Sequence, residues 1–95
     1  MPKLAETKAG TPLQERGRAR LMLRLPVWRA AFAQTFDYAF LDICEAYELA
    51  WNGLEFWINS DAPTRSERIE EYQQLMASLE LEAASSAAAE SRDWR

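Results

Sequence analysis

The sequence predicts an all-α fold in which a long helix, about residues 27–59, and a shorter antiparallel helix, about residues 65–84, pack as a helical hairpin. Two observations lead to this prediction. In the first segment only Gly53 interrupts a helical pattern of apolar side chains. Before the second segment, Thr64 and Glu67 form a capping-box signature, which marks the start of a helix. With 95 residues the chain holds one small domain.

Both ends of the chain are predicted to be flexible tails, residues 1–15 and 85–95, around a single helical domain over residues 16–84. The first tail contains two prolines and a glycine and shows no apolar periodicity. Near the other end, a run of alanines and serines is of low complexity, and the polar residues after it lack an apolar period. We therefore expect only the middle of the chain to pack.

Residues 16–25 fit either a short strand or a helix. Arginines alternate there with small or apolar residues, and a period of two is the signal of a strand. In a helix, however, Gly17, Leu21 and Leu25 would form one stripe, and arginine, leucine and alanine are good helix formers. Both structures remain open, and the alternation slightly favours the strand.

The long helix is expected to follow Pro26, since proline is well tolerated at the first position of a helix. On a helical wheel, its main apolar side chains fill an arc of about 160°. Glu45 and Glu48 fall on the opposite, polar side, which we expect to be solvated. Beyond them lies a minor apolar strip, a candidate second contact face, which consists of Tyr38, Leu49 and Phe56.

The second helix presents an apolar seam that is narrower than the arc it has to cover. Several large side chains of the long helix would then remain in water, although burying each one is worth about 1.5 to 3 kcal/mol. We therefore expect another surface to cover them: the leucines of residues 21–25 folding back, a second copy of the chain, or a different protein. A homodimer with a four-helix arrangement is the favoured solution. The predicted contact residues are Trp28, Phe32, Phe36, Phe40, Tyr47, Trp51 and Ile58.

Charge is unevenly distributed along the chain, although the net charge is only −4. Residues 1–29 carry seven basic side chains and two acidic ones, whereas residues 30–63 carry six acidic side chains and no basic one. An acidic body repels DNA, so that only the basic arm could approach it. Any contact with DNA is therefore expected in the basic N-terminal segment alone.

Residues 18–29, with the sequence RARLMLRLPVWR, resemble the strand and the helix start of ribbon-helix-helix repressors. In that family two chains pair their strands into a ribbon whose outward residues contact the major groove. The resemblance implies that Arg20, Met22 and Arg24 would face the bases. Antitoxins of this kind also join a basic DNA-binding start to an acidic toxin-binding end. The match ends where the first helix of that family would stop, because no turn signal appears there in this chain.

Few residues of the chain suit catalysis. There is no histidine, which removes the commonest general base and metal ligand, and no glycine-rich phosphate loop. The single Cys44 is most simply a buried apolar side chain. The one alternative is a carboxylate site for Mg²⁺, similar in carboxylate spacing to all-α nucleotide pyrophosphohydrolases, with the candidate ligands Glu45, Glu48, Glu67, Glu70 and Glu71. We expect no enzyme activity, no cofactor and no metal.

These observations predict a non-enzymatic helical module that dimerises or binds another protein, as an inhibitor or regulator. The alternative is an antitoxin-like DNA-binding regulator that uses residues 16–25. No segment has the uncharged apolar length of a membrane span, and the N-terminus lacks the pattern of a secretory signal. A cytoplasmic location without membrane contact is therefore expected.

Overall fold

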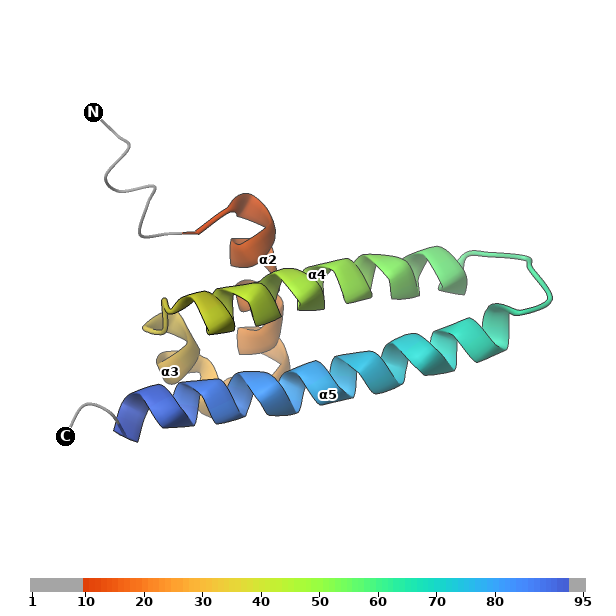
Figure 1. Cartoon of the computed structure of the whole chain (residues 1–95). Helices are drawn as coiled ribbons and strands as arrows, with labels where there is room; N and C mark the ends of the chain where they lie inside the picture. The colour runs from red at the N-terminus through yellow and green to blue at the C-terminus, as the bar shows by residue number, and fades with distance from the viewer. Residues whose placement is uncertain (1–9, 93–95) are drawn as a thin grey trace, which may run out of the picture.

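The computed structural model describes residues 10–92, which contain helices and short connections and no strand. The elements are α2 (Pro12–Arg24), the 3-10 turn η1 (Pro26–Trp28), α3 (Arg29–Ala33), α4 (Tyr38–Ile58) and α5 (Arg65–Arg92). Helices α4 and α5 lie side by side and run in opposite directions, while α2 crosses α4 (Figure 1). The all-α prediction is confirmed for this part of the chain. The outer parts of the two predicted tails, residues 1–9 and 93–95, lie outside it.

Residues 16–24 lie in helix α2 and Leu25 is its C-cap, so the strand alternative is wrong. The helix begins at Pro12, inside the segment expected to be a tail, because Thr11 and Gln14 form a capping box. The Thr11 hydroxyl accepts a hydrogen bond from the Gln14 N–H at 3.2 Å, and the Gln14 side chain accepts one from the Thr11 N–H at 2.9 Å. Two N–H groups without intrahelical partners are thereby satisfied, which is why the helix starts there.

The expected continuous helix over residues 27–59 is wrong, because the chain turns between α3 and α4. Residues 34–37 connect the two helices, and the side chain of Asp37 caps α4 by accepting a hydrogen bond from the Ala39 N–H at 3.1 Å. At the end of α3, the Thr35 hydroxyl donates to the Ala31 carbonyl at 2.7 Å. The aromatic residues before position 34 therefore fold back instead of extending the axis of α4.

The buried side chain of Arg18, on α2, holds this turn together. Its guanidinium donates hydrogen bonds to the carbonyl oxygens of Phe32 and, at 2.9 Å, of Thr35. It also pairs with Glu15 at 3.1 Å and lies over the ring of Phe36, 4.6 Å from the ring centroid. A positive group placed at the carbonyl end of a helix satisfies acceptors that the helix leaves unpaired. Arg18 thus links α2 to the end of α3.

Two glycines mark the closest contacts between helices. A Cβ added at Gly17 would overlap the backbone carbonyl of Cys44, so α2 and α4 touch backbone to backbone where they cross. A Cβ added at Gly53 of α4 would lie 2.5 Å from the ring of Tyr72, because this side chain of α5 packs directly against the glycine. Only a residue without a side chain allows either approach.

The core lies where α2, α3, α4 and α5 meet. Helix α5 continues to Arg92, so the predictions that the second helix ends near residue 84 and that a tail starts at 85 are wrong. Alanine is the best helix former, and Ala83 and Ala87 are buried, which explains the longer helix. The buried apolar side chains are Leu21, Phe32, Phe40, Leu41, Cys44, Tyr47, Ala50, Met76, Leu79, Ala83 and Ala87.

We expect Gly17→Ala to lower the free energy of unfolding by about 1 to 3 kcal/mol, the usual cost of overpacking, although alanine is the better helix former. The added methyl group meets backbone, which cannot rotate away. Chemical denaturation followed by circular dichroism measures the loss. In the control Gly53→Ala the methyl group meets the ring of Tyr72, a half-buried side chain that can turn, so the loss is smaller. A larger loss at Gly53 would contradict this account.

We expect Arg18→Leu to lower the free energy of unfolding by about 2 to 4 kcal/mol, since each buried acceptor left without a donor costs about 1 to 3 kcal/mol. The Thr35 carbonyl would lose the donor that Arg18 provides, and the Phe32 carbonyl would keep the 3.4 Å bond from the Thr35 N–H. The control is Arg29→Leu, because Arg29 is exposed; its effect stays within about 0.5 kcal/mol. The same denaturation experiment compares the two, and equal losses would mean that the turn does not depend on Arg18.

Candidate functional site

The aromatic residues predicted to form an intermolecular contact face are divided by the fold. Phe32, Phe40 and Tyr47 are fully buried within one chain, so their assignment to a contact face between chains is corrected. Trp28 and Trp51 are half-buried against the same core. Phe36 and Ile58 are about half exposed, at 47% and 46%. The physical reason is the turn at residues 34–37, which lets α2 and α3 cover much of the arc that the second helix leaves open.

Helix α2 also covers part of the polar side of α4, while Asn52 and Glu55 stay exposed. Glu48, expected to be solvated, is buried and lies 2.6 Å from Arg20 and 3.5 Å from Arg16. The guanidinium of Arg20 also lies over the indole of Trp51, 4.4 Å from the ring centroid. Two positive groups on one carboxylate offset the cost of burying its charge.

The three residues that the ribbon-helix-helix resemblance assigns to DNA do not share a face. Arg20 and Arg24 lie one helical turn apart, whereas Met22 points to another side of α2 and is half-buried against the core. Arg24 pairs with Glu80 of α5 at 3.3 Å. The strand on which that resemblance depends is absent from residues 10–92.

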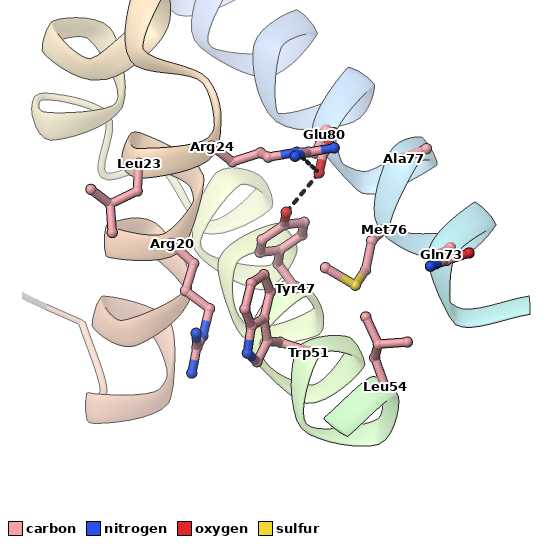
Figure 2. Close-up of a pocket in the computed structure, with 10 residues that line it drawn as sticks. All are labelled: Arg20, Leu23, Arg24, Tyr47, Trp51, Leu54, Gln73, Met76, Ala77 and Glu80. Atoms are coloured by element: carbon pink, nitrogen blue, oxygen red, sulfur yellow. Dashed lines mark hydrogen bonds and ion pairs between the residues drawn. The ribbon is translucent and has the colours of Figure 1, made fainter. Parts of the chain in front are cut away.

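A groove of about 520 Å³ opens between the C-terminal half of α2, the middle of α4 and α5. Figure 2 shows Tyr47, Trp51 and Leu54 of α4 at its floor, with side chains from α2 and α5 on either side. Most of the lining is apolar, and the polar groups sit on the two walls. We call this the α2–α5 groove; its lining residues are Arg20, Leu23, Arg24, Tyr47, Trp51, Leu54, Gln73, Met76, Ala77 and Glu80.

A polar cluster closes one end of the α2–α5 groove (Figure 2). The Tyr47 hydroxyl donates to a carboxylate oxygen of Glu80 at 2.6 Å, and the guanidinium of Arg24 donates to the same oxygen at 3.3 Å. Burial, together with the negative charge of Glu80, raises the pKa of Tyr47 above its ordinary value. The phenol therefore stays protonated and works as a fixed hydrogen-bond donor that orients Glu80.

A second, smaller groove of about 390 Å³ continues the first along α5. The two share Ala77 and Glu80, so together they form one largely apolar face. Leu23 at the rim of the first and Leu81 at the rim of the second are 76% and 75% exposed. Val27, in η1 between the two groove-lining residues Leu25 and Trp28, is 87% exposed. The second groove is lined by Leu25, Trp28, Ala77, Glu80, Leu81 and Ala84.

The minor apolar strip lies on the outer surface of α4. Its three residues, Tyr38, Leu49 and Phe56, are all exposed. Acidic side chains, Asp42 and Glu45, lie between the first two residues of the strip. Its apolar residues stand at least seven positions apart, and none of the grooves described above opens on it. The strip is therefore a less continuous apolar surface than the α2–α5 groove.

The residues suggested for catalysis are not brought together. Glu48 is held by two arginines, and Glu67, Glu70 and Glu71 lie on the first turns of α5, far along the chain from it. Within residues 10–92, no group of three histidine, cysteine, aspartate or glutamate side chains lies close enough to hold a metal ion. Among the helices described, none has both the length and the apolar stretch needed to cross a bilayer.

Comparison with family models, with curated protein sequences and with solved structures finds no match to this chain. The candidate site therefore rests on its own geometry.

Sequence reasoning missed most of the groove. Tyr47 and Trp51 are predicted partner contacts that also line it, and Arg20 and Arg24 are predicted DNA contacts that do so. The sequence does not single out Gln73, Ala77 or Glu80. A signal was present, because Arg16, Arg20 and Arg24 are spaced by four residues and would line one edge of a helix. That spacing has meaning only once residues 16–25 are known to be helical.

We expect the thiol of Cys44 to resist alkylation in the folded protein. Burial raises its pKa from 9.0 to about 12, so that at pH 9 the thiol is almost wholly protonated, whereas half of the unfolded thiols are ionised. Mass spectrometry after iodoacetamide treatment at pH 9, with and without denaturant, measures this. The native protein should react at least about 100-fold more slowly. Equal rates would show that Cys44 is accessible.

Proposed function

We propose that this protein is a non-enzymatic helical protein–protein interaction module whose binding surface is the α2–α5 groove. The observation that carries the proposal is an apolar groove that meets a second apolar groove at Ala77 and Glu80, with the rim residues Leu23 and Leu81 about three-quarters exposed. Contiguous exposed apolar surface with a polar rim is typical of protein interaction sites. Tryptophan and methionine, which are enriched in such sites, are both present here as Trp51 and Met76.

The groove is held in shape before a partner arrives. The indole N–H of Trp51 donates to Glu55 at 3.2 Å, and the guanidinium of Arg20 lies over the ring, 4.4 Å from its centroid. At one end of the groove, the hydrogen bonds that Glu80 of α5 accepts from Arg24 of α2 and Tyr47 of α4 fix the distance between α2 and α5. A surface that is ordered in the free protein loses less conformational entropy on binding. Such a module would inhibit or regulate its partner by occupying a surface of that partner.

The alternative, DNA binding through residues 16–25, is not favoured by the contacts of α2. Arg16 and Arg20 share Glu48, Arg18 is buried at the turn, and Arg24 pairs with Glu80. A contact to phosphate or to a base would have to compete with carboxylates that already hold these groups.

A photoreactive residue placed in the groove tests the proposal. With p-benzoylphenylalanine in place of Leu23, we expect irradiation of cells that produce the protein to yield one discrete crosslinked species. The control carries the same residue in place of Leu49, which is also exposed but lies on the outer surface of α4. Mass spectrometry then identifies what is attached. No adduct at position 23, or equal adducts at both positions, would contradict the proposal.

A further inference from the structure

The two walls of the α2–α5 groove carry opposite charges. On α2, Arg20 and Arg24 line the groove and Arg16 lies one turn before them, whereas Arg18 is buried. On α5, Glu80 lines the groove, and residues 69–91 contain no basic residue. On a helical wheel Glu70 lies about 60° from Gln73, on the edge of α5 that borders the groove. One face of the molecule therefore presents a basic wall and an acidic wall, with an apolar floor between them.

A face of this kind is complementary to itself in one orientation. If two copies meet about a two-fold axis that runs along the groove, the α2 wall of each copy lies opposite the α5 wall of the other. A two-fold axis across the groove would instead bring α2 against α2 and glutamates against glutamates. Complementary potentials favour the first arrangement and suppress the second.

We infer that the α2–α5 groove binds a second copy of this chain, through a symmetric contact about an axis along the groove. The inference rests on the proposed function and names its partner. Leu23, which projects from the α2 wall, would meet the α5 wall of the other copy, where Ala77 and Ala84 are small residues next to the grooves. A protruding side chain opposite a small one is how helices interlock.

The other exposed apolar strip does not favour a second copy in the same way. Tyr38, Leu49 and Phe56 lie on α4, and residues 30–63 contain no lysine or arginine. Two copies that met through this strip would bring Asp42 and Glu45 near their own counterparts, without a compensating positive charge. This strip therefore provides a control surface for the experiment.

Sedimentation velocity of the full chain at increasing micromolar concentrations tests the inference. We expect a monomer–dimer equilibrium, from which Leu23→Asp removes the dimer. Leu49→Asp introduces the same change at an exposed leucine of the outer strip and leaves the dimer intact. Circular dichroism confirms that both variants are folded, as expected since both side chains are exposed in the single chain.

Charge reversal tests the proposed orientation. Glu70→Arg would bring positive charges together across the contact, and because each contact occurs twice we expect the dimer dissociation constant to rise at least about tenfold at low salt. High salt should reduce this effect. The control Glu82→Arg makes the same change about 180° away from Gln73 on α5, and should change the constant less than about twofold.

A dimer lost in Leu23→Asp and weakened by Glu70→Arg, with both controls unaffected, supports the inference. A monomer at every concentration overturns it, as does a dimer that depends on Leu49 or an equal response to both charge reversals. These outcomes are separate from the photocrosslinking test. A monomeric protein that crosslinks through position 23 to a different protein would keep the proposed function and exclude the second copy as the partner.

Discussion

The fold depends on the burial of one guanidinium group. Arg18 lies in the interior, where it holds the carbonyl oxygens of Phe32 and Thr35 and contacts the ring of Phe36. A buried charge is costly unless its hydrogen bonds are satisfied, and here the carbonyls of Phe32, in α3, and Thr35, in the turn after it, accept them. The end of α3 and the middle of α2 therefore have to come together. The chain must turn before α4, and the aromatic residues of α3 pack onto α4 instead of extending beyond it.

The groove is a consequence of how α2 then crosses α4. At Gly17 the two backbones touch, which brings the next turn of α2 close enough for Arg20 to reach both Glu48 and Trp51. From that crossing, the end of α2 approaches α5, where Arg24 pairs with Glu80. Helices that cross closely at one point diverge elsewhere, and the space between them opens over Trp51 and Leu54 of α4. The same contacts that stabilise the fold thus also shape the candidate site.

The helical class, the start of the second helix at residue 65 and its apolar seam could be predicted from the sequence, because capping signals and periodicity are local. The turn at residues 34–37 could not, since only Asp37 marks it locally and its main support comes from Arg18, far away in the chain. The helical wheel placed Glu48 in water because it assumed a hairpin of two helices. Glu48 is instead buried, because α2 packs on that side of α4. A helical wheel of α4 alone contains no information about the position of α2.

The same long-range pairing changes the meaning of the basic segment. Read along the chain, its arginines form a free positive arm, suited to DNA. In the folded chain, three of these arginines form ion pairs with Glu48 and Glu80, and Arg18 is buried. Helix α2 as a whole still carries a net positive charge, and the neighbouring α5 carries a net negative one. Paired charges at the rim of an apolar groove add little affinity by themselves, because they are already solvated or satisfied. They do determine which approach is repelled and which is attracted, and so select the orientation of a partner while the apolar surface provides the binding energy.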